Sequence, residues 1–373
     1  MNPVGPSITI HAGPEGIRID QRRPQVVSLL KGMPATAALA RISLLLPICG
    51  GAQTLAARRA IEGARNDEPG QEVEARREAS LWREQAHAAA WRLAIDWPDL
   101  LGEPRNLQGM RQLLNTGNGP DAARALEQYL PGLGDVAGPE DLLDWVVHTD
   151  CSAARLLRRV LVLEEDSEDA DGDTHRMDAD RDTHRMAGDA DRDTHRIAGD
   201  ALAERARAVF DAPTFDALAP GDEAVEVGPA AMARDPRIPS LYKAPAITQV
   251  ARRLLAQVLD THVIARALQD PPEVMARQPD SWSLAAGKGM GRAQTARGPV
   301  FHRVTLDPRD GETVTDWRVL APTDWHFSPC GPLARSAATG RRELPWLRFL
   351  VAGFDPCAPW TVVTSAEEGG SDA

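Results

Sequence analysis

The chain has 373 residues, of which 43% are hydrophobic, so it can bury a sizeable core and is not a wholly disordered chain. Asp and Glu number 54 against 42 Lys and Arg, and the resulting net charge of −12 argues against binding nucleic acid or an anionic membrane by charge alone. Four cysteines at long spacings are too few for a disulfide framework. The length predicts one large domain or two moderate ones.

The first residues show no basic segment followed by an apolar run, which a secretory signal would require. The most apolar stretch, 35–52, contains Arg41 and Pro47 and is too short to cross a bilayer. We therefore expect a cytoplasmic protein that binds neither membrane nor nucleic acid.

The first part of the chain is predicted to be mainly helical after a short strand region. Residues 16–30 show partial alternation of apolar and polar side chains, which favours short strands. Apolar residues then recur at helical spacing, with interruptions at Pro47 and Gly50-Gly51. The predicted helices are 35–65 (with those interruptions), 74–97, 106–116, 120–130 and 139–163.

The second part combines helices with a β-hairpin. Helices are predicted over 201–210, 246–268 and 271–278. Residues 299–320 alternate on both sides of Asp310-Gly311, a turn signal, and so predict the hairpin. The fold class is therefore α+β and mostly helical.

Residues 164–200 contain an imperfect repeat of the sequence Asp-Thr-His-Arg, with 14 acidic residues against 5 arginines. The repeat keeps neither a helical nor a strand register and has few large apolar groups. It cannot bury enough surface to offset the entropy of ordering, so we predict a disordered acidic insertion. The tail 361–373, which contains three acidic residues, is also predicted to be disordered, and the remaining chain is electrically balanced.

A second interpretation of the repeat is a metal-sequestering tract. His175, His184 and His195 recur beside carboxylates. Three spaced histidines on a flexible segment would bind a divalent metal only weakly.

Common catalytic motifs are absent from the sequence. Gly287 to Gly291 superficially resembles a phosphate loop, but no Lys-Ser/Thr follows and the glycine spacing fits no nucleotide fingerprint. We predict a glycine-rich structural turn there. No Gly-x-Ser-x-Gly, His-Glu-x-x-His or Cys-x-x-Cys occurs, so hydrolase, zinc-protease and thioredoxin functions lack support.

Two cysteines lie in local sequences that could expose a thiolate. Cys49 precedes Gly50-Gly51 at a predicted helix start, where the pKa of a thiol can be lowered. Cys357 lies between Pro356 and Pro359, which fix the backbone around one sulfur. For each cysteine alone, a structural role is the simpler interpretation.

Taken together, the two segments resemble the large subunit of nickel–iron hydrogenases, and more closely the accessory proteins derived from it that are called HupK or HoxV. That family carries an N-terminal Cys-Gly-x-Cys and a C-terminal Asp-Pro-Cys-x-x-Cys. The blocks that match, in the same order, are Glu15-Gly16, Cys49-Gly50, Gly289-Met290-Gly291 with Arg297 to His302, Pro322 to Pro329, and Asp355-Pro356-Cys357. The similarity covers roughly 14–64 and 284–360.

The departures from the family pattern point away from catalysis. The resemblance implies four nickel-binding thiolates in the enzyme, and two of these positions are Ala52 and Trp360 here. The histidine that closes the first motif is Ala56, and the arginine after Ser-Pro is Cys330. We therefore expect no stable nickel–iron centre and no enzymatic activity.

The resemblance implies a maturation scaffold with motifs at both ends of the chain converging on one site. Residues 1–163 and 201–360 would form a single large-subunit-like domain around the insertion. Cys49 and Cys357 would bind a transient Fe(CN)2(CO) unit, with Cys330 a candidate third ligand. The family implies a HypC-type chaperone, a HypD-type maturation protein and the immature hydrogenase large subunit as partners.

The residues around these motifs have simpler expected roles. Glu15 and His302 are expected to be structural, Arg297 to order the start of the hairpin, and Cys151 to belong to the core. Two other functions stay open. One is a divergent hydrogenase-like redox or H2-sensing subunit, and the other is a nickel-handling protein that uses the His/Asp repeat.

Overall fold

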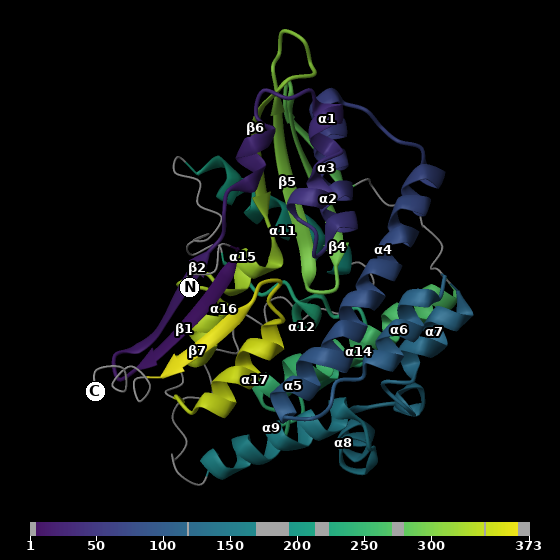
Figure 1. Cartoon of the computed structure of the whole chain (residues 1–373), viewed down its shortest axis with the longest axis vertical. Coiled ribbons are helices and arrows are strands. Elements are labelled where there is room, and N and C mark those ends of the chain that lie inside the picture. The colour runs from purple at the N-terminus through teal and green to yellow at the C-terminus, as the bar shows by residue number, and fades with distance from the viewer. Residues whose placement is uncertain are drawn as a thin grey trace.

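A computed structural model describes residues 5–117, 119–168, 194–212, 224–270, 280–338 and 341–364. The elements form a three-stranded sheet, a four-stranded sheet with a long helix across it, and a larger helical part. Figure 1 shows the four-stranded sheet at the top, the three-stranded sheet at the left and most helices below and to the right. The predicted α+β, mostly helical fold class is confirmed.

The three-stranded sheet joins the two ends of the described chain. It consists of β1 (Ser7–Gly13), β2 (Gly16–Arg22) and β7 (Trp360–Thr364), in the order β2-β1-β7. β1 pairs antiparallel with β2 and parallel with β7, and Ile10 lies opposite Val362. Figure 1 shows β1 and β7 side by side.

The prediction of a disordered tail from residue 361 is wrong for its first four residues. Residues 361–364 are Thr-Val-Val-Thr, all β-branched, and this composition favours a strand against β1. Residues 365–373 lie outside the described residues. β1 itself was not predicted, although its burial alternates strictly through Ile8, Ile10 and Ala12.

The four-stranded antiparallel sheet confirms the predicted hairpin and extends it. β5 (Gly298–Leu306) and β6 (Val314–Leu320) form the hairpin, and β4 (Lys288–Thr295) and β3 (Ser281–Ala285) continue the sheet. Only Gly287, with φ of +70°, belongs to the predicted glycine-rich turn.

The other two glycines of that motif allow helix α3 (Gly50–Arg65) to approach β4 closely. A Cβ atom added at Gly289 would lie 2.1 Å from the carbonyl oxygen of Ala60, and one at Gly291 would lie 2.2 Å from that of Ala56. Backbone therefore packs directly against backbone, and this contact holds α3 close against the sheet.

Short helices connect β2 with α3. They are η1 (Val26–Leu30), α1 (Ala35–Leu39) and α2 (Ile42–Leu45). The prediction of a strand over 26–30 is wrong. Val27 and Leu30 lie three residues apart and are both buried, so a 3₁₀ turn places them on one face.

The helical part is built around α14 (Gln249–Gln269), which is buried along most of its length. It packs against α4, α7, α9, α12 and α17. The remaining helices are α4 (Gln71–Trp91), the π-helical turn η2 (Arg92–Asp96), α5 (Trp97–Leu101), α6 (Leu107–Asn115), α7 (Pro120–Glu127), η3 (Leu133–Asp135), α8 (Pro139–His148), α9 (Ser152–Glu168), α11 (Thr194–Asp211), α12 (Pro229–Met232), α13 (Ile238–Leu241), α15 (Pro322–His326), α16 (Pro332–Ala337) and α17 (Leu344–Phe354).

Two predicted segments differ most clearly from the structure. The helix predicted over 139–163 is two helices, α8 and α9, because Thr149 has extended backbone angles and ends the first. The predicted insertion 164–200 overlaps helices at both ends, since α9 runs to Glu168 and α11 begins at Thr194. The rest of the insertion and the predicted helix 271–278 lie outside the described residues.

No helix among the described residues has both the length and the apolar character needed to cross a membrane.

Candidate functional site

Cys49 is the residue immediately before α3. Its backbone angles, φ −129° and ψ 49°, are not helical, so the helix begins directly after it. The first free amides of α3, from Gly51 and Ala52, donate to the two carboxylate oxygens of Glu84 at 2.6 and 3.0 Å. Glu84, from α4, therefore caps the positive end of α3 beside the sulfur.

Cys357 follows the end of α17. Asp355 adopts the left-handed conformation, with φ of +46°, and Pro356 cannot continue the helix. The backbone N–H of Cys357 donates to the hydroxyl of Thr323 at 3.3 Å, and its sulfur lies 3.0 Å from the same hydroxyl. Thr323 belongs to α15, which lies in the middle of the molecule below the end of β6 (Figure 1).

The fold brings these two cysteines into one site. Burial, together with the neighbouring sulfur of Cys357, raises the pKa of the Cys49 thiol to about 12. Both sulfurs also interact electrostatically with Arg23 and Arg297. The predicted convergence of the N- and C-terminal motifs is thus confirmed. Metal binding by Cys49 and Cys357 stays a prediction.

A directional chain of hydrogen bonds orients the surroundings of Cys49. The indole N–H of Trp317 donates to Nδ1 of His302 at 2.9 Å, so Nε2 carries the proton and donates to Oε1 of Gln53 at 2.6 Å. The amide Nε2 of Gln53 then faces the Cys49 sulfur at 3.4 Å. Burial, with help from Arg23, lowers the pKa of His302 to about 3, so His302 stays neutral and uses both ring nitrogens within the protein.

A second network holds the Cys357 segment. Nε of Arg297 donates to the backbone carbonyl of Asp355 at 2.9 Å, and its Nη2 lies 3.4 Å from the carboxylate. Arg92 donates to the same carboxylate at 2.8 Å. Arg297 was expected to order the start of the hairpin, but its side chain instead ties that turn to Asp355. Burial and the proximity of Asp355 raise the pKa of Asp96 to about 6.

The other sequence-predicted residues have surroundings of their own. Cys330, the candidate third ligand, is exposed, and its carbonyl accepts a hydrogen bond from Arg335 at 2.6 Å. Glu15 is exposed in the turn between β1 and β2. Cys151 is half-buried and packs against the helical core, as predicted.

Within the described ranges, no group of three or more His, Cys, Asp or Glu side chains is placed to hold a metal ion. Cys49 and Cys357 offer two thiols at one site. A metal bound by this pair would keep most of its coordination positions for ligands that the protein does not supply.

Several residues of this site were missed from the sequence. Gln53 lies one helical turn after Cys49, and Thr323 and Asp355 fall inside the matched blocks, so their positions could have been inferred. Arg23 and Glu84 carried no local signal, because their roles depend on contacts between distant elements.

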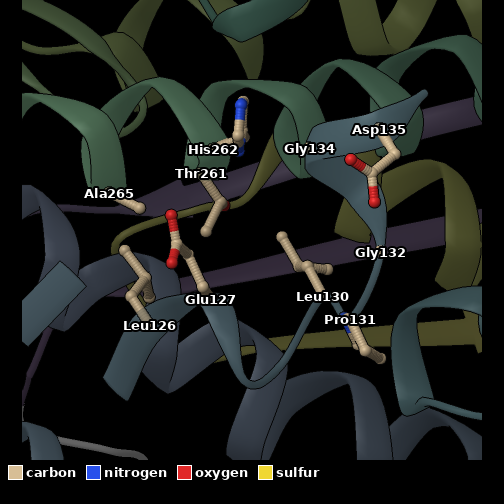
Figure 2. A pocket seen from close by; sticks show the side chains of 10 residues that line it. All are labelled: Leu126, Glu127, Leu130, Pro131, Gly132, Gly134, Asp135, Thr261, His262 and Ala265. Carbon is tan, nitrogen blue, oxygen red and sulfur yellow. The ribbon is translucent and has the colours of Figure 1, made fainter. Parts of the chain in front are cut away.

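A pocket of about 310 Å³ lies elsewhere, between the α7–η3 segment and α14. Figure 2 shows Glu127, Leu130 and Thr261 among the side chains that line it. Thr261 accepts a hydrogen bond from Nη2 of Arg92 at 3.3 Å, so one wall of the pocket is linked to the Asp355 network.

The architecture and the converging thiol motifs define the class of protein, which has the fold of a nickel–iron hydrogenase large subunit. The structure is similar to the NAD+-reducing [NiFe]-hydrogenase in its H2-reduced state, with a TM-score of 0.51 and 92% of each chain covered. The sequence identity is 14%, so this likeness shows the fold alone.

Curated relatives then define the family. The hydrogenase expression/formation protein HupK of Azotobacter vinelandii is 30% identical over 350 residues, and HupV of Azotobacter chroococcum mcd 1 is 31% identical over 353 residues. Each alignment covers 92% of both proteins. No family model matches the sequence. The chain belongs to the HupK/HupV family of hydrogenase expression/formation proteins.

Proposed function

We propose that this chain is a non-catalytic maturation scaffold that holds an Fe(CN)2(CO) fragment between Cys49 and Cys357 before the fragment passes to the hydrogenase large subunit. The observation that carries the proposal is that these two thiols, which come from opposite ends of the chain, lie at one site. Membership of a family of hydrogenase expression/formation proteins supports the same context.

The donor set supports a carrier more than a resident metal centre. Soft thiolates are suitable ligands for a low-valent iron carbonyl fragment, and two of them leave its own ligands in place. The metal binds thiolates, so loading must displace the proton that burial holds on the Cys49 sulfur. This cost weakens binding, and weaker binding is an advantage for a fragment that must leave again.

The two positions where the enzyme family has further cysteines support a non-catalytic role. Ala52 is fully buried in the core beneath the sheet, and its backbone N–H donates to the carboxylate of Glu84. Trp360 begins β7, packs against the helical core and pairs with Ile8. Neither position offers a sulfur that could bridge to a second metal.

The proposed partners follow from the proposed cargo. A HypC-type chaperone and a HypD-type maturation protein would deliver the iron fragment, and the immature hydrogenase large subunit would receive it. Cys49 and Cys357 are both only partly buried, as a site that exchanges cargo with another protein requires.

The proposal is tested by maturation assays in cells that depend on this chain. Cys49→Ala and Cys357→Ala are each expected to abolish hydrogenase activity while the variant proteins keep the wild-type melting temperature. Cys151→Ala serves as the matched control, since its thiol lies in the helical core. Full maturation by both site variants would overturn the proposal.

The purified wild-type protein also tests the alternative that the chain is a hydrogenase-like redox or H2-sensing subunit. Wild-type protein is expected to contain no stoichiometric nickel and to oxidise no hydrogen. Robust hydrogen turnover by the purified chain would replace the scaffold with a divergent hydrogenase-like subunit.

A further inference from the structure

Arg23 follows strand β2 and carries hydrogen-bond donors that the chain does not use. Its Nη1 donates to Oδ1 of Asp324, and within the described residues this is the one hydrogen bond that its side chain makes. The side chain is 21% exposed, so solvent reaches only part of the guanidinium. A guanidinium has five N–H donors in a planar fork, and most of this fork therefore lacks an acceptor from the protein.

The position of Arg23 is fixed from two sides. Asp324 is fully buried, and its Oδ2 accepts the backbone N–H of Ala321 at 2.6 Å, so the carboxylate that holds Arg23 cannot turn away. Nearby, the side chain of Gln21 donates to the carbonyl of Phe327 and attaches the end of β2 to the same region. Thr323, the neighbour of Asp324 in α15, contacts the Cys357 sulfur at 3.0 Å.

Two guanidiniums lie near the thiols, and the side chain of Arg23 is the more exposed of the two, at 21% against 10% for Arg297. Arg23 and Arg297 both interact electrostatically with Cys49 and Cys357. Arg297 directs Nε and Nη2 to Asp355, at 2.9 and 3.4 Å, and so holds the Cys357 segment, whereas Arg23 bonds Asp324 and keeps N–H groups that an entering anion can reach from solvent. His302, the third basic group near Arg23, is neutral and uses both nitrogens elsewhere.

In the described part of the chain, none of the buried side-chain atoms that lack a partner belongs to Arg23, so its remaining N–H groups reach solvent, and an anion that enters the site can replace the water there with a charge-assisted hydrogen bond. We propose that Arg23 binds a small linear anion beside the two thiols by donating its free N–H groups to the terminal nitrogen of that anion. That this anion is a cyanide ligand of the iron fragment rests on the proposed function. Arg23 would then bind the fragment through a cyanide ligand, while the two thiolates bind its iron.

The first test uses the purified full chain and thiocyanate, a linear anion with a terminal nitrogen acceptor. The rate of Cys357 alkylation by iodoacetamide is measured by mass spectrometry with thiocyanate and with chloride at equal ionic strength. Thiocyanate is expected to slow the reaction severalfold in the wild type and not in Arg23→Gln. Arg22→Gln, which changes the neighbouring exposed arginine, is expected to behave like the wild type.

Protection that is absent in the wild type, or that persists in Arg23→Gln, would overturn the proposal. An equal loss of protection in Arg22→Gln would also overturn the proposal, since general charge attraction would then explain the effect of thiocyanate. If Arg23→Gln lowers the melting temperature, Arg23→Lys takes its place. That variant keeps a cation for Asp324 but loses the planar fork, so it is expected to lose the protection, and full protection in it would contradict the proposal.

The second test separates this inference from the proposed function. The chain is purified together with the iron-loading maturation proteins, and its infrared spectrum is recorded. Arg23→Gln is expected to move one cyanide stretching band to lower wavenumber, because a hydrogen bond to the cyanide nitrogen raises that frequency. If wild-type protein shows no such bands, the proposed function fails, while the thiocyanate result still decides whether Arg23 binds anions.

Discussion

At the scale of single residues, His302 near Cys49 is a buried polar side chain whose ring nitrogens are used in hydrogen bonds within the protein and not to bind a metal. His302 was expected to be structural from the sequence, and its two ring nitrogens bond Trp317 and Gln53. The matched block that contains His302 could be recognised from the sequence. Its tautomer could not, because that depends on an indole from the neighbouring strand.

The burial of Cys49 predicts a large difference in thiol reactivity. A pKa of about 12 leaves a thiolate population roughly a thousandfold smaller than that of an ordinary cysteine near pH 8. With iodoacetamide at pH 8, the exposed Cys330 is expected to react first and Cys49 far more slowly, as measured by peptide mass spectrometry. All four cysteines should react alike in guanidinium chloride. Equal native rates for Cys49 and Cys330 would contradict the raised pKa of the Cys49 thiol.

At the scale of elements, the strongly periodic segments were predicted well. The hairpin of β5 and β6 and most helices before residue 163 were found from apolar spacing and turn residues. β3 and β4 were missed because the glycines of β4 read as a turn. These glycines are required because α3 approaches β4 closely, and no local sequence pattern reveals such a tertiary contact.

One buried carboxyl joins three helices and predicts a pH dependence of stability. Glu164 of α9 accepts hydrogen bonds from Thr248, the residue before α14, and from Trp346 of α17. Burial raises its pKa from 4.5 to about 7. Between these pH values the folded chain binds a proton that the unfolded chain has lost. The protonated carboxyl therefore supports folding fully below pH 4.5, and this support is lost as the pH rises towards 7.

Glu164→Gln keeps a neutral group at this position at every pH. Relative to the wild type, its free energy of unfolding in urea is expected to be higher by roughly 3 kcal/mol at pH 8 and nearly unchanged near pH 4.5. Glu15→Gln, at an exposed turn, is the control and should show no such pH-dependent difference. A difference that stays constant from pH 4.5 to 8 would mean that Glu164 does not carry the proton.

At the scale of the whole molecule, the two ends of the chain build one site and one sheet. The matched motifs predicted that Cys49 and Cys357 would converge, because the family order fixes which segments meet. The charged residues between the thiols and the helical part, such as Arg92 and Asp355, could not be paired in advance. Arg92 reaches Asp355 across 263 residues of sequence, a pairing that only the packed fold defines.

The acidic repeat predicts an outcome at this scale as well. Replacing 170–193 with a Gly/Ser segment of equal length, together with His195→Ala, removes all three repeat histidines and leaves α9 intact. Hydrogenase maturation in cells and the melting temperature of the purified chain are expected to stay at wild-type values. A loss of maturation that added nickel restores would favour the nickel-handling function instead.

The central claim is that Cys49 and Cys357 together hold an iron fragment that carries cyanide and carbon monoxide. The direct measurement is the infrared spectrum of the chain purified together with its maturation partners. The account predicts cyanide and carbon monoxide stretching bands in the wild type and in Cys330→Ala, and their loss in Cys49→Ala and in Cys357→Ala. Bands of undiminished intensity in the Cys49→Ala/Cys357→Ala double variant would contradict it.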